Sequence, residues 1–164
     1  MEASAKLWNR EELAPVLARR RGAGGERVVL ANGVFDLLHV GHVRFLEAAR
    51  MRGDVLVVAL NSDASARALK GPGRPALPLS ERAELVAALR VVDYVTAFDE
   101  LELERTLRIL RPDVHAKGTD YDSESVPELA VDRELGIEIA ICGDPKDHSS
   151  SALLARLAGR APSA

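Results

Sequence analysis

The sequence is poor in cysteine. Its one thiol, Cys142, has no second cysteine with which to form a disulfide inside the chain. The residues before it, Ile139, Ala140 and Ile141, are apolar, and such surroundings favour a buried, inert thiol. We therefore expect Cys142 to be structural, with a catalytic thiol as the alternative.

Long apolar runs are also missing. The longest aliphatic run, Val55 to Leu60, has six residues, whereas a helix needs roughly 20 to cross a bilayer. We expect no membrane span. The first residues, Met1 to Lys6, lead into charged residues and not into the apolar core of a signal peptide. The expected location is the cytoplasm.

Neither sign of charge dominates. The 164 residues include 22 basic and 25 acidic ones, a net charge of −3. No strongly basic stretch stands alone, which argues against nucleic acid as the main partner and favours a small charged metabolite. The length suits one domain. We expect an N-terminal helix and loop over residues 1–26, the main domain over 27–160 and a short tail over 161–164.

Short apolar runs typical of buried strands alternate with segments of helical periodicity. The expected strands are 28–31, 55–60, 91–96, one near Val114, and 137–142. The expected helices are 8–21, 41–52, 64–69, one capped by Ser80, 100–110, 127–135 and 149–157, with loops at 22–25 and 70–75. This alternation predicts a doubly wound α/β fold with a mainly five-stranded parallel sheet. Such sheets bind ligands beyond the carboxyl ends of their strands.

Two histidines give the sharpest chemical signal. His39 and His42 flank Gly41 at the start of an expected helix, directly after the first strand. A helix start offers free backbone N–H groups to a phosphate, and imidazoles add further donors to a phosphoryl group under attack. Simple capping of the helix is the structural alternative. A metal site would need ligands that the neighbouring sequence does not offer.

The residues around this pair, G-x-F-D-x-x-H-x-G-H, resemble the signature of the cytidylyltransferase-like nucleotidyltransferases. Three later segments extend the likeness to the bacterial D-glycero-beta-D-manno-heptose 1-phosphate adenylyltransferases. They are Asn61-Ser62-Asp63, Lys70-Gly71 with Arg74-Pro75, and Lys117-Gly118-Thr119-Asp120-Tyr121. The order and spacing match from about Val28 to Leu157, which implies a Rossmann-like nucleotidyltransferase fold.

The resemblance also implies roles for individual residues. Three catalytic residues are implied: His39, His42 and Lys70. The implied nucleotide-binding residues are Asn32, Gly33, Val34, Phe35, Asp36, Gly41, Lys117, Gly118, Asp120, Tyr121, Ser149, Ser150 and Ser151. The implied substrate-binding residues are Asp63, Arg74 and Arg82, and no residue is implied as a metal ligand.

Several of these roles have structural alternatives. Arg82 could be a solvated helix arginine that contacts no phosphate. The segment 117–121, expected in a loop after the fourth strand, could be a turn closed by Gly118 and Asp120. Ser149-Ser150-Ser151 replaces the serine and two threonines usual in relatives, and capping alone would explain Ser149.

The implied reaction is in-line attack of a sugar phosphate, heptose 1-phosphate, on the α-phosphorus of ATP, with pyrophosphate leaving and Mg²⁺ sharing the charge. A CTP-dependent cytidylyltransferase acting on glycerol 3-phosphate, or on another small phosphate or phosphonate, is the nearest alternative. A nucleotide-binding module without turnover is another. No P-loop motif or nucleophile elbow is present. By analogy with relatives we expect a homodimer, without the sugar kinase to which heptose enzymes are often fused.

Overall fold

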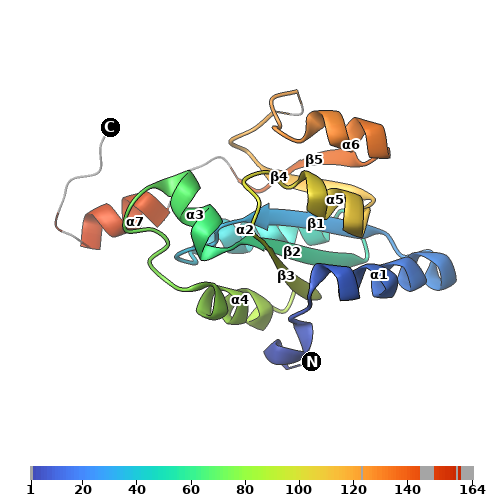
Figure 1. Cartoon of the computed structure of the whole chain (residues 1–164), viewed down its shortest axis with the longest axis horizontal. Helices are drawn as coiled ribbons and strands as arrows, with labels where there is room; N and C mark the ends of the chain where they lie inside the picture. Colours follow the sequence, from blue (N-terminus) through green and yellow to red (C-terminus); the bar gives the residue numbers. More distant parts are fainter. Residues whose placement is uncertain (1, 123, 145–149, 158, 160–164) are drawn as a thin grey trace.

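The computed structural model describes residues 2–122, 124–144, 150–157 and 159 (Figure 1). The strands in this part of the chain are β1 (Val28–Gly33), β2 (Val55–Asn61), β3 (Tyr94–Phe98), β4 (Val114–Gly118) and β5 (Glu138–Cys142). They form one sheet in the order β3-β2-β1-β4-β5, and each neighbouring pair is parallel. The predicted five-stranded parallel sheet is confirmed.

Helices cover both faces of this sheet. They are α1 (Arg10–Gly24), α2 (Val40–Arg50), α3 (Asp63–Lys70), α4 (Leu79–Ala88), α5 (Glu104–Leu110), α6 (Leu129–Leu135) and α7 (Ser150–Leu157), with a 3₁₀ turn η1 (Ala3–Lys6). One core packs α2 and α4 on the sheet, and the other packs α1, α5 and α6. Val29 faces the first core and Val28 the second, as the alternation of a strand requires. The doubly wound fold is confirmed.

The strand order creates a switch point beside β1. From β1 the chain builds β2 and β3 on one side, then returns to place β4 and β5 on the other. The carboxyl ends of β1 and β4 therefore lie next to each other where the winding reverses. Open parallel sheets hold their ligands in the crevice at such a point.

Three aspartates fix the opposite, amino end of the sheet. Each stands directly before a strand, and its Oδ2 accepts a hydrogen bond of 2.8 Å from a backbone N–H at the start of the neighbouring strand. The pairs are Asp54 with Arg27, Asp93 with Leu56, and Asp113 with Val28. These bonds satisfy N–H groups that the start of a parallel ladder leaves open.

The first helix lies further along the chain than predicted. It begins at Arg10 and not at Trp8, and it continues to Gly24 and does not end at Arg21. Gly25 has φ of 63°, the left-handed conformation that ends helices and that glycine adopts without strain. The last glycine of the 22–25 segment is therefore the one that ends the helix.

Two helix starts differ from the prediction. Helix α4 begins at Leu79 with Pro78 before it, so Ser80 lies inside the helix and is not its cap. Helix α5 begins at Glu104 and not at Glu100. The Glu100 carboxylate binds the Arg10 guanidinium at 2.8 and 2.9 Å, which holds Glu100 in the preceding turn.

Two strands are also shifted. Strand β3 begins at Tyr94 and not at Val91, because the turn that follows α4 buries Val92 in the core and bonds its N–H to the Leu89 carbonyl. Strand β4 extends to Gly118, so Lys117 is a strand residue and does not lie in a loop.

Among the described residues, no helix is both long and apolar enough to cross a membrane.

Candidate active site

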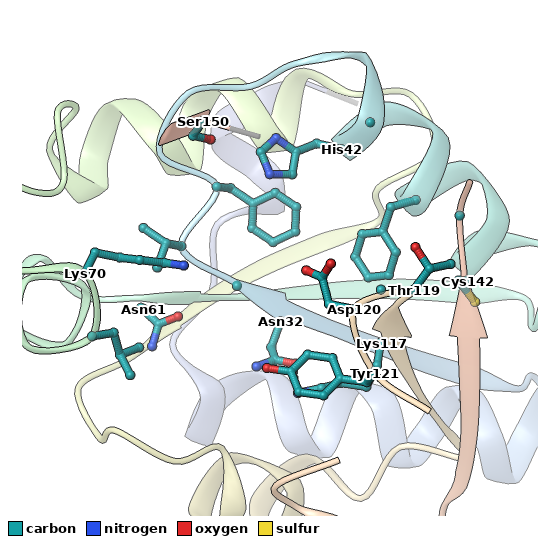
Figure 2. A pocket seen from close by; sticks show the side chains of 18 of the residues that line it. Asn32, His42, Asn61, Lys70, Lys117, Thr119, Asp120, Tyr121, Cys142 and Ser150 are labelled. Carbon is teal, nitrogen blue, oxygen red and sulfur yellow. The ribbon is translucent and has the colours of Figure 1, made fainter. Parts of the chain in front are cut away.

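A cavity of about 520 Å³ opens at the carboxyl end of the sheet (Figure 2). Its wall comes from the ends of β1, β2, β3, β4 and β5, from the start of α2 and from the end of α3. Fourteen of the predicted site residues line it: Asn32, Gly33, Val34, Phe35, His39, Gly41, His42, Lys70, Arg74, Lys117, Gly118, Asp120, Tyr121 and Ser150. Segments far apart in the sequence thus meet at the predicted edge.

Two of the three predicted serines cannot be placed at the cavity. Ser149 lies outside the described residues, and of Ser151 only the backbone, inside α7, is described. Ser150 lines the cavity, and its hydroxyl donates to the Leu37 carbonyl at 3.1 Å. This bond joins the start of α7 to the loop that carries the histidines.

Arg82 does not contact the cavity, which corrects the prediction that it binds phosphate. The side chain is fully buried, so it is not a solvated helix arginine either. Its guanidinium donates to the carbonyls of Val34 (2.6 Å), Asn61 (2.9 Å) and Leu77 (3.1 Å). It also donates to Asp63 Oδ1 at 2.7 Å, and Asp63 likewise lies outside the cavity wall. The pair ties the ends of β1 and β2 together.

Asp36, predicted to bind nucleotide, is buried behind the cavity wall. Its carboxylate accepts from the N–H groups of Ala76 (2.7 Å) and Leu77 (3.0 Å) and from Arg74 Nε (2.7 Å). Burial would raise the pKa of Asp36, but these bonds outweigh it and hold the pKa below its usual value. Asp36 therefore anchors the 70–75 loop and orients Arg74, which does reach the cavity.

The two histidines stack on each other at the start of α2. Their ring centroids are 3.8 Å apart with 22° between the planes. His39 is the N-cap residue, but its side chain makes no capping hydrogen bond, so capping does not explain it. Burial and the neighbouring His39 lower the pKa of His42 to about 4. His42 is therefore neutral at physiological pH, and its one N–H is hydrogen-bonded to the Leu37 backbone, while Nδ1 is buried without a partner among the described residues.

A tight turn presents these rings. Phe35 has φ of 48°, a left-handed conformation that is uncommon for a side-chain-bearing residue. Its ring lies 5.0 Å from that of His42, with Phe45 stacked beyond it at 6.4 Å. A Cβ at Gly33 would approach the Phe35 ring to 3.0 Å. Gly33 thus leaves the space in which the Phe35 ring supports His42.

A buried polar network forms the floor beside β4, and the sequence did not predict most of it. His115 Nδ1 lies 2.9 Å from Asp132 Oδ2, and its Nε2 lies 3.2 Å from Asn32 Oδ1. Lys117 Nζ donates to Asn32 Oδ1 at 3.3 Å and to Glu128 Oε2 at 3.0 Å. His115 and Asp132 are fully buried. The one available signal was a histidine inside the apolar run of an expected strand.

Lys70 and Lys117 differ in accessibility. The Lys117 ammonium is held by Glu128 and Asn32 and lies 5.0 Å from the centre of the Tyr121 ring. Lys70 is exposed and extends from the end of α3 into the cavity (Figure 2). No carboxylate of the described residues lies within ion-pair distance of its ammonium. The charge of Lys70 is therefore open to a ligand.

The remaining wall contains side chains that the sequence did not single out. Leu69, Phe98 and Leu101 add apolar surface, while Arg44, Glu102 and Asp144 add charge. Arg44 and Asp144 pair with each other at 3.0 Å. Cys142 is 5% exposed at this wall, which confirms the predicted burial, and burial raises the pKa of its thiol, as a structural role would require. Among the described residues no group of His, Cys, Asp or Glu is arranged to hold a metal ion alone.

Comparison with known proteins gives consistent matches. A family model described as cytidylyltransferase-like matches residues 30–156. The bifunctional protein HldE of Syntrophotalea carbinolica is 52% identical over 128 residues, which are 77% of this chain and 26% of that protein. The bifunctional protein HldE of Streptomyces coelicolor is 47% identical over 156 residues, 95% of this chain and 34% of that protein. The chain thus spans between a quarter and a third of these curated relatives.

A solved structure agrees in fold. The crystal structure of the lipopolysaccharide core biosynthesis protein from Thermoplasma volcanium has a TM-score of 0.65 and 28% sequence identity. The match covers 74% of this chain and all of that one.

Proposed function

The chain belongs to the cytidylyltransferase-like family, and from that membership we propose that it is a nucleotidyltransferase that transfers AMP from ATP to heptose 1-phosphate. An oxygen of the sugar phosphate attacks the α-phosphorus of ATP and forms the new P–O bond. The bond from the α-phosphorus to the bridging oxygen breaks, and pyrophosphate leaves in line. The products are ADP-heptose and pyrophosphate, and no covalent intermediate on the protein is needed.

The stacked histidine pair at the start of α2 carries this proposal. In the transition state, negative charge collects on the oxygens of the transferred phosphoryl group, and preorganised donors stabilise it. Contact with Phe35 and the hydrogen bond to the Leu37 backbone fix the orientation of the His42 ring. The negative charge of a bound triphosphate favours the protonated ring, whose second N–H can then donate. The free backbone N–H groups and the positive dipole end of α2 add to the same field. His39 and His42 would therefore stabilise charge on the α-phosphate.

Lys70 supplies the mobile positive charge. It stands at the end of α3 and extends into the cavity that His42 also lines, with no carboxylate partner among the described residues (Figure 2). Lysine is a flexible point charge suited to phosphates that move during transfer. We assign it to the leaving pyrophosphate. Arg74, oriented by Asp36, is assigned to the sugar phosphate.

Mg²⁺ is part of the proposal. In nucleotide sites this ion keeps several waters and takes one or two carboxylates besides the phosphates. Glu102 and Asp120 line the cavity and carry carboxylates of this kind. Bound with the triphosphate, the ion would neutralise phosphate charge.

Two findings favour the heptose acceptor and ATP. The motifs at 61–63, 70–75 and 117–121 resemble those of heptose 1-phosphate adenylyltransferases, and the relatives are bifunctional HldE proteins. The similar solved structure is that of a lipopolysaccharide core biosynthesis protein. The family model is named for cytidylyl transfer, which keeps a CTP-dependent enzyme for glycerol 3-phosphate as the second candidate.

The test is a pyrophosphate-release assay with Mg²⁺, in which ATP and CTP are each crossed with heptose 1-phosphate and glycerol 3-phosphate. Release only with ATP and the heptose supports the proposal. Release only with CTP supports the second candidate, the CTP-dependent enzyme. No release in any well, together with ATP binding by calorimetry, supports a binding module without turnover.

We further propose that the protein works in the cytoplasm as a homodimer. Relatives of this family commonly pair, which is the basis of the proposal. Light scattering coupled to size-exclusion chromatography measures the mass directly. A mass of one chain, 17.7 kDa, at micromolar concentration would contradict the dimer.

A further inference from the structure

The floor network determines which atom of Asn32 faces the cavity. A lysine ammonium can only donate hydrogen bonds. The Asn32 atom 3.3 Å from Lys117 Nζ must therefore be the amide oxygen, because an amide nitrogen there would face another donor. That oxygen is also the atom 3.2 Å from His115 Nε2. Asn32 Oδ1 thus accepts two bonds from the floor.

The same argument determines the proton on His115. Since Asn32 Oδ1 can only accept, His115 Nε2 must carry an N–H. One further proton lies in the 2.9 Å bond between His115 Nδ1 and Asp132 Oδ2, on whichever of the two atoms holds it. Either way, Asp132 holds the ring so that its Nε2–H points at Asn32.

Asn32 Nδ2 is left with two open donors. No described residue accepts a hydrogen bond from this nitrogen. It is also not enclosed in the protein, so a ligand can reach it. Asn32 is partly exposed and lines the cavity next to Lys117 and Tyr121 (Figure 2). A bound molecule is the acceptor that these donors can meet.

We propose that His115 and Asp132 are positioning residues which lock the Asn32 amide, so that Nδ2 donates to an acceptor atom of the bound nucleotide. The proposal rests on the proposed function for the identity of the ligand. Lys117, held by Glu128, is the second donor to the Asn32 oxygen. The buried floor thus pairs each basic group with an acidic one. The donor is thus oriented before the nucleotide arrives, which lowers the entropy lost on binding.

The first test is read on the native protein and needs no turnover; a variant serves only to assign the signal. In ¹⁵N-labelled native protein, NMR distinguishes a protonated ring nitrogen from an unprotonated one. His115 Nε2, identified by its absence in His115→Gln, is expected to be protonated at neutral pH. An unprotonated Nε2 would mean that the Asn32 amide is reversed and would overturn the proposal, whatever the protein catalyses.

The second test separates positioning from packing. A glutamine amide nitrogen can take the place of Nε2, whereas an asparagine amide nitrogen takes the place of Nδ1. In the double variant His115→Gln/Asp132→Asn, the new asparagine donates to the glutamine oxygen and the glutamine nitrogen donates to Asn32. In His115→Asn the donor to Asn32 is lost. Affinity for α,β-methylene ATP, an unreactive analogue, is measured by calorimetry for both.

We expect His115→Asn to weaken this affinity about tenfold, the value of one oriented hydrogen bond. The double variant should stay within about threefold of the native protein. Thr96→Val serves as the control, because it changes a buried strand residue whose hydroxyl has no partner among the described residues. Equal weakening in both His115 variants would show that packing alone is needed and would overturn the positioning role. Analogue binding without AMP transfer would contradict the proposed function and leave this inference standing.

Discussion

His42 lines the cavity and His115 lies buried beneath it, and the two illustrate opposite uses of one residue type. His42 is packed against another imidazole and a phenyl ring, with no carboxylate bonded to it, and burial keeps it neutral. His115 is fully buried, and both of its ring nitrogens have protein partners. The two histidines thus differ in their ring nitrogens: Nδ1 of His42 has no partner among the described residues, whereas both nitrogens of His115 have one. Lys70 and Lys117 repeat the contrast.

Removing His42 should have the largest effect. In His42→Ala we expect turnover to fall by about 10² to 10⁴, because a donor to the transition state is lost. Affinity for ATP should change only a few-fold, since the remaining donors still hold the ground state. Single-turnover kinetics and calorimetry measure the two quantities. An equal loss of both would contradict the assigned role.

Removing His115 should lower stability, in addition to its expected effect on nucleotide affinity. In His115→Ala the Asp132 carboxylate stays buried without its partner, which costs roughly 3 kcal/mol of unfolding free energy. Urea denaturation measures this value. The double variant His115→Leu/Asp132→Leu should recover much of the loss, because it removes both charged groups. If the single variant were as stable as the native protein, the buried pair would not contribute to stability as expected.

The two lysines provide a third test. Lys70→Ala should weaken ATP binding about tenfold, with little change in stability, because the exposed ammonium has no carboxylate partner among the described residues. Lys117→Ala should instead lower stability, since it leaves Glu128 buried and unpaired. Arg67→Ala, an exposed change on the same helix as Lys70, is the control. A similar loss of affinity in Arg67→Ala would show that the effect of Lys70 is not local.

The last prediction concerns the pH dependence of stability. The folded pKa of His42 is about 4, below the 6.5 of the unfolded chain. Between these values the unfolded chain binds a proton that the folded protein does not, so stability falls as pH falls through this window. In His42→Gln this part of the slope should disappear. Thermal denaturation between pH 7 and 4 measures it, and an unchanged slope would show that folding does not shift the pKa of His42.

Apolar patterning predicted much of the fold. The runs at 28–31 and 55–60 are long, uninterrupted and buried on both faces, so their strands were found with errors of one or two residues. The predicted start of β3 was wrong because Val92 is buried in the core although it lies before the strand. The start of α5 failed because the bond between Arg10 and Glu100 joins residues distant in sequence. Neither contact leaves a local signal.

The site was predictable where a motif carries it and not where tertiary contacts do. The histidines and Lys70 stand in recognisable segments and reach the cavity. Arg82 also stood in a motif, but its partners are backbone carbonyls at the ends of two strands, which no sequence pattern reveals. The role of His115 could not be predicted for a similar reason, since Asp132 approaches it only when α6 packs on the sheet.

The aspartates at the amino end of the sheet have a consequence for how acceptor specificity can change. Asp54, Asp93 and Asp113 set the starting register of β1 and β2 against their neighbours, and a slip of one residue would turn every side chain to the wrong face. The cavity lies at the other end. The 71–75 loop, which carries Arg74, can therefore be exchanged between homologues, in evolution or by loop grafting, while strand alignment is kept by residues at the far end of the sheet.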